Sequence, residues 1–297
     1  MTDAPDGRRA VRLLIAPYDS GHADTRMGAG PTALDRAGAV DRLRARGHVV
    51  RAQVLAPSPG WQAELATAFE LDRLVADAVA RSRASEEVPV LLAGNCNTTL
   101  GVLAGLSGPG RRIGLLWLDA HGDFNTPDED TSGFLDGQGL AIVVGRCWRA
   151  LAARVPGFTP LPERDVVLVG ARDLSSAQVD VLERSDLTWL RPEQARRPAD
   201  VAAALDDLAG RVDAVHFHVD LDVHDPSIAP ANGYAAPDGL SAADVVRVLD
   251  LAAARVPVVS ATLASYDPAH DVEGRMRETA LALLEAVADR ATPLSTV

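Results

Sequence analysis

The sequence predicts an α/β fold in which a mostly parallel sheet is covered by helices on both faces. Short apolar runs alternate with longer amphipathic stretches along the chain, which is the pattern of repeated strand–helix units. The apolar fraction of 47% is sufficient for a large core. Two acidic motifs directly follow two of the apolar runs, as expected where functional side chains collect at the carboxyl ends of parallel strands.

The predicted strands are the short apolar runs, which are typical of segments buried inside a sheet. In order they are Val11–Pro17, Val49–Val54, Val88–Ala93, Ile113–Leu118, Val166–Val169, Ala214–Val219 and Val258–Leu263.

The predicted helices are the amphipathic stretches between and after these runs. In order they are Pro31–Arg46, Trp61–Arg83, Asn97–Leu106, Ser175–Ser185, Arg197–Arg211, Ser241–Arg255 and Gly274–Asp289. Pro31 suits a first helical turn. Ser241 is a helix N-cap with an acid, Asp244, at the third helical position. The acidic, glycine-containing loop from Pro127 to Gly139 is expected to shape a pocket rather than to serve only as a connection.

Length and charge exclude several classes of function. A chain of 297 residues fits one large domain or two smaller ones, and because no segment has the composition of a linker we expect one domain, residues 1–297. The net charge of −12 argues against a nucleic-acid partner. Two cysteines cannot build a disulfide framework, and neither a signal-peptide core nor a membrane-spanning apolar run is evident. The sequence therefore predicts a cytoplasmic protein without nucleic-acid or membrane partners.

Two short motifs place ionisable side chains at predicted strand ends. Asp119, His121 and Asp123 follow one apolar run, and Asp220 and Asp222 follow another. Residues at i and i+2 of an extended segment point the same way, so each set can converge. Such a group needs a positive charge among its members, and its oxygen and nitrogen atoms suit a divalent ion such as manganese. One motif alone is also compatible with a polar loop, but the pair predicts a metal centre.

With these motifs in place, the chain resembles the ureohydrolase family of arginases, agmatinases and formimidoylglutamases over almost its whole length. The resemblance is carried by residues 28–34, 93–97, 117–127, 220–230 and 268–271. It implies a three-layer α/β/α fold with a doubly wound sheet, one or two Mn²⁺ ions, a small-molecule substrate, and a homo-oligomer, commonly a trimer or a hexamer.

The resemblance also implies a role for each residue of the two motifs. Asp119 and Asp220 would bridge two metals. Asp123 would complete the first metal site and orient the attacking hydroxide, and His121 and Asp222 would complete the second site.

Cys96 stands where the first metal of the family has a histidine. A thiolate would be a softer ligand and would change the affinity and metal preference of the site. Some family members that act on N-hydroxylated guanidines resemble this chain in having cysteine there. The alternative is that Cys96 is a small buried residue and that the first metal is weakly bound or absent.

Further departures concern the substrate. Asp136 replaces a proton-transferring histidine of arginases, and it would act as a general acid or base only if its pKa were raised; otherwise it is a solvated loop carboxylate. Ser265 stands where a glutamate pairs with the guanidinium group, and Asp267 is a candidate substitute. Asn125 and Ser132 fall where arginases hold the substrate carboxylate.

Ser175 and Gln178 replace acids that contact the α-amino group in arginases, and this change argues against L-arginine as substrate. On the strand before Asp220, His216 and His218 alternate. A ring there could approach the metals, but a hydrogen-bonded core histidine is the favoured interpretation for both.

The leading functional hypothesis is a metal-dependent hydrolase of a C–N bond in a guanidino, N-modified guanidino or formimino compound. The alternative is a non-catalytic relative that binds a small molecule or acts as a subunit, which the changes at Cys96, Asp136 and Ser265 would favour. A cysteine nucleophile is disfavoured because no histidine base lies near Cys96 in the sequence.

Overall fold

The computed structural model describes residues 7–58, 63–130 and 132–294, which are organised around one large sheet. This 8-stranded sheet has the order β4-β1-β5-β10-β9-β6-β7-β8, and all neighbouring strands are parallel, as predicted. Its strands are β1 (Ala10–Ala16), β4 (Val49–Val54), β5 (Val88–Ala93), β6 (Ile113–Leu118), β7 (Val166–Val169), β8 (Thr188–Leu190), β9 (Ala214–Asp220) and β10 (Val258–Ala264). The short strands β2 (Tyr18–Asp19) and β3 (His22–Ala23) form a separate antiparallel pair.

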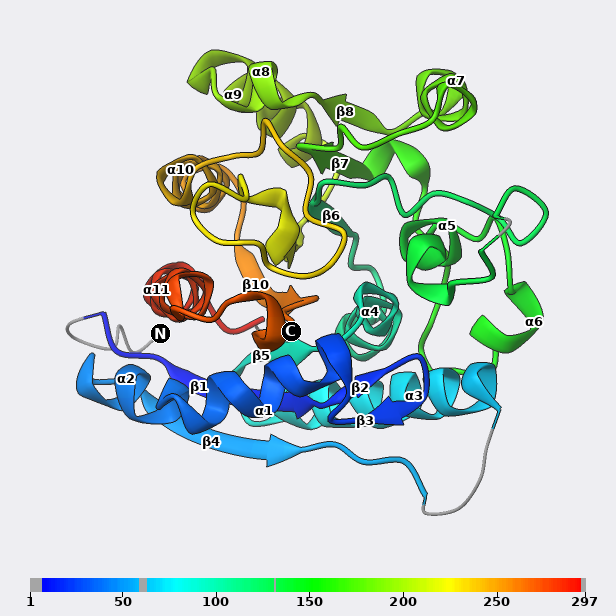
Figure 1. Ribbon diagram of the computed structural model, residues 1–297. Helices are drawn as coiled ribbons and strands as arrows, with labels where there is room; N and C mark the ends of the chain where they lie inside the picture. Colours follow the sequence, from blue (N-terminus) through cyan, green and yellow to red (C-terminus); the bar gives the residue numbers. More distant parts are fainter. Residues whose placement is uncertain (1–6, 59–62, 131, 295–297) are drawn as a thin grey trace.

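Helices cover both faces of the large sheet, which confirms the three-layer arrangement (Figure 1). One face packs against α1 (Ala29–Arg36), α2 (Ala39–Ala45), α9 (Pro198–Ala209), α10 (Ala242–Ala253) and α11 (Arg275–Arg290). The other packs against α3 (Glu64–Ala84), α4 (Thr99–Leu106) and α5 (Gly139–Val143). Along β1, Leu13 and Ile15 enter the first core, and Leu14 and Ala16 enter the second. Burial on both faces explains why the central strands are continuous apolar runs, whereas the edge strand β4 is mostly exposed and includes Arg51 and Gln53.

The predicted helices differ from the structure in a few places. The single helix predicted over 31–46 is two helices, because Gly38 adopts a φ of 95° between α1 and α2. Trp61, the predicted start of the next helix, lies outside the described residues, and α3 begins at Glu64 as described. The capping boxes at Ser241 and Ser175 are present, the latter beginning α7 (Ser176–Arg184). The short helices α6 (Arg149–Ala152) and α8 (Pro192–Ala195) and the strand β8 were not predicted.

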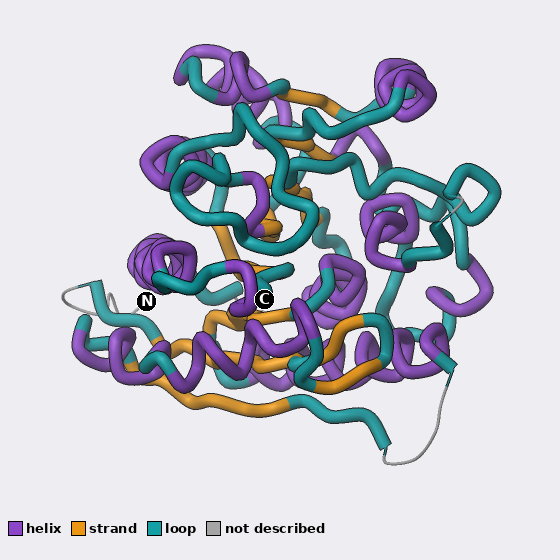
Figure 2. Tube along the Cα trace, in the orientation of Figure 1, coloured by secondary structure: helices purple, strands orange, loops and turns teal. Residues whose placement is uncertain are grey.

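Strands β5, β10, β9 and β6 are consecutive in the sheet and end on the same side, because they are parallel. The loops that follow them therefore meet at one edge, as the teal segments in Figure 2 indicate. Within the described part of the chain, the helices are too short or too polar for any of them to cross a membrane.

Candidate metal centre

Asp119 lies fully buried just beyond the end of β6. The indole Nε1 of Trp117 donates a hydrogen bond to Asp119 Oδ2 at 2.9 Å, and the backbone N–H of His121 donates to Oδ1 at 2.7 Å. His121 Nδ1 lies 3.3 Å from Asp119 Oδ1 and 3.4 Å from Asp222 Oδ2, so this imidazole connects the two motifs. Asp123 is also buried, and its φ of 47° is in the left-handed region, which turns the chain sharply at this point.

The second motif lies beside the first because β9 is the neighbour of β6. Leu118 is paired with Val219, which places Asp119 and Asp220 at the same level of the sheet. The backbone N–H of Asp222 donates to Asp220 Oδ1 at 2.8 Å, and Asp222 Oδ1 accepts from the backbone of the first motif at 3.2 Å. The aspartates of both motifs are therefore held by backbone groups as well as by side chains.

This group of carboxylates is unfavourable without a cation. Burial raises the pKa of Asp119, and burial together with neighbouring carboxylates raises the pKa values of Asp123 and Asp220 well above their ordinary range. Burial lowers the pKa of His121, but the charges of Asp222 and Asp119 raise it to about 10. Divalent cations would supply the positive charge that these aspartates lack.

The donor atoms fit such cations. Among the described residues, three groups of side chains have ligand atoms within 4.8 Å of one another, and two of them consist of residues singled out above: Asp119, His121 and Asp222 form the first, and Cys96, Asp123 and Asp136 form the second. The first group offers oxygen and nitrogen, which suit manganese, whereas the second includes a sulfur, which suits a softer ion. The structure thus brings together every residue predicted to bind metal.

Cys96 is fully buried in the short turn η2 (Cys96–Thr98), just beyond β5. Its Sγ donates to Asp220 Oδ2 at 3.1 Å and lies 3.4 Å from Ser265 Oγ. Burial and the carboxylates around it raise the pKa of the thiol well above its ordinary value. The thiol would therefore lose its proton only on binding a cation.

Asp136 is buried beside Cys96, so the alternative of a solvated loop carboxylate is wrong. Its oxygens accept hydrogen bonds from Asn95 Nδ2 at 2.9 Å and from the backbone N–H of Asn97 at 3.2 Å. Burial raises the pKa of Asp136 to about 7, although these donors act in the opposite direction. A carboxyl group with that pKa can take up and release a proton near neutral pH, as general acid–base catalysis requires.

Ser265 follows β10 with a φ of 64°, and its hydroxyl faces the carboxylates and Cys96. The nearby Asp267 is directed elsewhere: its Oδ1 accepts from the backbone N–H of Ala269 at 2.9 Å at the start of a short turn. The described lining of the metal-site cavity includes Ser265 but not Asp267. Asp267 is thus engaged in capping this turn, and Ser265 is the residue of this segment that faces the cavity.

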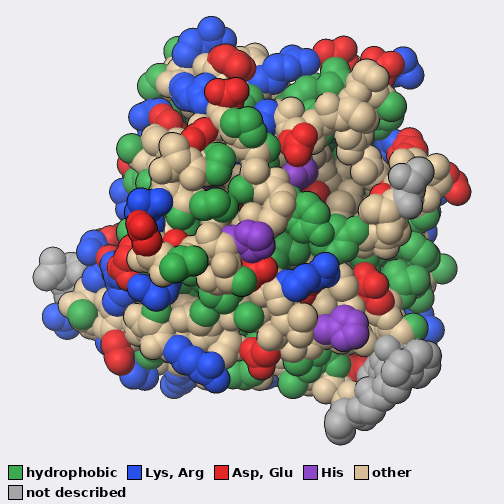
Figure 3. Space-filling model, in the orientation of Figure 1, with side chains coloured by type: hydrophobic (Ala, Val, Ile, Leu, Met, Phe, Trp, Pro, Cys, Tyr) green, Lys and Arg blue, Asp and Glu red, His purple; other side chains and the backbone are tan. Residues whose placement is uncertain are grey.

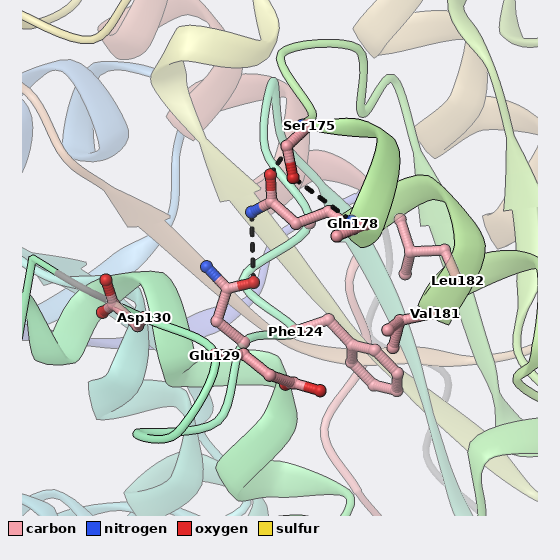
Figure 4. Close-up of a pocket in the computed structure, with 10 residues that line it drawn as sticks. Phe124, Glu129, Asp130, Ser175, Gln178, Val181 and Leu182 are labelled. Carbon is pink, nitrogen blue, oxygen red and sulfur yellow. Dashed lines mark hydrogen bonds between the residues drawn. The ribbon is translucent and has the colours of Figure 1, made fainter.

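Two adjoining cavities give access to the centre. One of about 120 Å³ opens above the carboxylates, and one of about 260 Å³ lies beside it; Asn125 and Gln178 line both. Gln178 Nε2 donates to Asn125 Oδ1 at 3.1 Å, so this amide pair forms the boundary. Figure 4 shows Val181 and Leu182 on the same helix as Gln178, opposite the ring of Phe124. Figure 3 shows histidine and acidic side chains at the surface in the middle of this view of the molecule.

Besides Ser265, the predicted substrate-binding serines are Ser175 and Ser132, and these two have different positions. Ser175 lines the 260 Å³ cavity together with Asn125, and its Oγ accepts from the backbone N–H of Gln178 at 3.3 Å. Ser132 is exposed in a separate hollow, where its Oγ donates to Asp130 Oδ1 at 2.7 Å. Asp130 itself lines the 260 Å³ cavity, which confirms that the acidic loop shapes a pocket.

The loop after β9 contributes residues that the sequence did not indicate. Asn232 Nδ2 donates to Asp222 Oδ2 at 3.2 Å and to the backbone oxygen of Ser265 at 2.9 Å. The ring of Tyr234, 48% exposed, lies edge-on to His121 with ring centroids 6.5 Å apart. No local pattern marks these residues, because they belong to an irregular loop.

Several known proteins that resemble this chain in sequence and fold are arginases. The model described as "Arginase family" matches residues 9–290. The arginase of Brevibacillus brevis is 28% identical over 290 residues, covering 93% of this chain and 97% of that one. The N(omega)-hydroxy-L-arginine amidinohydrolase of Streptomyces lavendulae is 27% identical over 248 residues, covering 84% and 85%. The crystal structure of Bacillus subtilis arginase superposes with a TM-score of 0.83 at 26% identity, covering 94% and 98%. A family match over nearly the whole length, together with this shared fold, shows that the chain belongs to the arginase family.

Proposed function

We propose that this chain is a metal-dependent hydrolase that cleaves a C–N bond of an N-modified guanidino or formimino compound, and that L-arginine is not its preferred substrate. The observation that carries this proposal is the convergence of the two aspartate motifs under a cavity of about 120 Å³. Mn²⁺ is the ion proposed for the group of Asp119, His121 and Asp222. The family resemblance supports one domain over residues 1–297 and a homo-oligomer, a trimer or hexamer.

The chain's own residues supply positioning and proton transfer. Bound metals would lower the pKa of a water molecule and polarise the substrate. Asp123, which lines the cavity, would orient the attacking water. In the reaction the water oxygen joins the central carbon, the C–N bond breaks, one water proton passes to the leaving nitrogen, and the other is released as the oxygen becomes the carbonyl of the urea or amide product. Asp136, with a pKa of about 7, is the group proposed to carry that proton.

Neutral side chains around the cavities support a modified substrate. Ser265 has no carboxylate to pair with a guanidinium group. Asn125 and Gln178 are neutral amides that bond to each other, so an α-ammonium group finds no charged partner there. A lost charge-assisted hydrogen bond costs roughly 1.5–3 kcal/mol, so each loss reduces the specificity constant about tenfold to a hundredfold. The name of the Streptomyces lavendulae relative describes action on an N-hydroxylated arginine, which supports this substrate class.

The test is a comparison of substrates with the manganese-loaded protein. Release of amine would be measured with L-arginine, Nω-hydroxy-L-arginine, agmatine and N-formimino-L-glutamate, and Asp123→Asn of unchanged melting temperature would serve as the inactive control. We expect the specificity constant for at least one of the modified compounds to exceed that for L-arginine at least tenfold. A specificity constant for L-arginine of about 10⁴ M⁻¹s⁻¹ or more would refute the substrate assignment. Metal binding without turnover of any compound would favour the non-catalytic alternative.

A further inference from the structure

The two histidines of β9 differ in how their ring nitrogens are satisfied. His216 has partners for both: Nδ1 lies 2.7 Å from Ser260 Oγ and Nε2 lies 3.1 Å from Thr262 Oγ1. His218 has one partner: Nδ1 lies 2.8 Å from Thr99 Oγ1, and the buried Nε2 has none in the described part of the chain. His216 is thus a core histidine as expected, whereas His218 leaves a fully buried nitrogen without a hydrogen bond, a costly arrangement unless something else occupies it.

His218 also lies among metal-ligating side chains. Its imidazole, Cys96 Sγ and an Asp119 oxygen have ligand atoms within 4.8 Å of one another. The ring stacks on Trp117, with centroids 3.8 Å apart, and the same indole donates to Asp119.

We propose that Nε2 of His218 is a ligand of the first metal, in place of the imidazole missing at position 96, and that Cys96, His218 and Asp119 together select a borderline ion such as Zn²⁺ over Mn²⁺. Thr99 Oγ1 lies 2.8 Å from Nδ1 and would accept the Nδ1 proton in the tautomer that leaves Nε2 for the metal, as outer-sphere partners of metal-bound histidines do. Sulfur and imidazole ligands are those that Zn²⁺ prefers. The oxygen-rich group with Asp222 keeps its proposed preference for Mn²⁺.

The distances are compatible with this assignment. Zinc lies about 2.3 Å from sulfur and about 2.0–2.2 Å from oxygen or nitrogen, so two ligands of one ion are separated by about 3.5 Å in a tetrahedral site. Cys96 Sγ and Asp220 Oδ2 are 3.1 Å apart, near that separation. The ligand atoms of Cys96, Asp119 and His218 lie within 4.8 Å of one another, so a small movement of these side chains would bring them to the separation expected around one ion.

His224 provides a matched control. It is buried, its Nδ1 lies 2.9 Å from the backbone oxygen of Leu221, and its Nε2 also lacks a partner within the described ranges. The ligand groups found among the described residues include His218 but not His224. An effect that arises merely from disturbing a buried imidazole should therefore appear equally in both variants.

The first experiment measures metal affinity. Chelator-treated wild type, His218→Gln and His224→Gln would be titrated with Zn²⁺ against a competing chelator, with melting temperatures recorded. We expect the zinc affinity of one site to be at least about tenfold lower in His218→Gln. Loss of an outer-sphere partner alone typically lowers metal affinity by about tenfold to a hundredfold, and loss of a ligand should cost no less. His224→Gln should match the wild type. Equal zinc affinity in all three proteins would overturn the proposal.

The second experiment does not depend on His218→Gln, so it stands even if that variant fails to fold. His121→Gln, which lacks the imidazole of the other ligand group, and the wild type would each be loaded with one equivalent of Zn²⁺ and measured by X-ray absorption. We expect sulfur and imidazole on the same ion, whereas zinc with sulfur but no imidazole, or with imidazole but no sulfur, would overturn the assignment. The proposed metal centre underlies this assignment, but both measurements read metal binding rather than turnover, so a failure of the hydrolase proposal would be seen separately.

Discussion

Asp136→Asn should remove a loss of stability that the metal-free protein otherwise undergoes as the pH rises. Burial raises the pKa of Asp136 from 3.8 to about 7, so the folded state binds its proton more tightly than the unfolded state does. The stability that the protonated group contributes is complete below about pH 4, declines as the pH rises from there to about 7, and is then constant. At about 1.4 kcal/mol per pH unit, the total decline is at most roughly 4 kcal/mol.

The asparagine cannot ionise, so it removes this decline at a constant cost. Asp136 accepts from two donors, Asn95 Nδ2 and the Asn97 backbone N–H, whereas an amide has one accepting oxygen. Leaving one buried donor without a partner costs about 1–3 kcal/mol at every pH. The variant should therefore be no more stable than the wild type near pH 4.5, and should gain roughly 3 kcal/mol relative to it by pH 8.

The assay is urea unfolding of chelator-treated protein at several pH values between about 4.5 and 8. Asp225→Asn is the control, because hydrogen bonds from Ser227 lower the pKa of Asp225 and its stabilising effect is lost only as the pH falls through the acidic range. A difference between wild type and Asp136→Asn that stays constant over this range would refute the reasoning. It would mean that the donors keep the Asp136 carboxylate ionised despite its burial.

Three further predictions concern the metals and the backbone around them. Asp220→Ala should remove both ions from the manganese-loaded protein, and metal analysis that found one ion retained would show that Asp220 does not bridge. Cys96→His should strengthen manganese binding and Cys96→Ala should weaken one site only; equal affinities in these and the wild type would show that Cys96 serves packing alone. Gly94→Ala should lower the melting temperature by several degrees, because a Cβ there would overlap the backbone oxygen of Tyr18 and overpacking costs about 1–3 kcal/mol. An unchanged melting temperature would show that the β2 segment yields without cost.

The elements predicted correctly are those whose signal is local. Most predicted strands of the sheet are runs largely buried on both faces, so their composition alone distinguishes them, whereas the edge strand β4 is mostly exposed. Strand β8 has only 3 residues and α8 only 4, too few for a periodic pattern to be recognised. The break at Gly38 was missed because the apolar spacing continues across it, and the left-handed backbone there becomes evident only from the packing of two helices.

The candidate site likewise contains some features that local spacing predicts and others that it does not. The spacing within 119–123 and 220–222 was enough to indicate that carboxylates and His121 converge, because neighbours at i and i+2 on one strand end need no knowledge of the rest of the fold. Spacing could not show that Asp136 is buried, that Ser132 lies outside the metal-site cavity, or that Asn232 reaches Asp222.

The sequence by itself determined the fold class, the strand ends that carry the proposed ligands, and the family. Only the tertiary structure decided which other side chains face those ligands. His216 and His218 lie on the same strand, yet the hydroxyls of β10 satisfy both nitrogens of His216, while Nε2 of His218 has no partner among the described residues and its imidazole lies in one group of ligand atoms with Cys96. The reason is physical: a side chain's burial and partners depend on which distant segments pack against it, and the order β5-β10-β9-β6 that brings them together is set by long-range contacts.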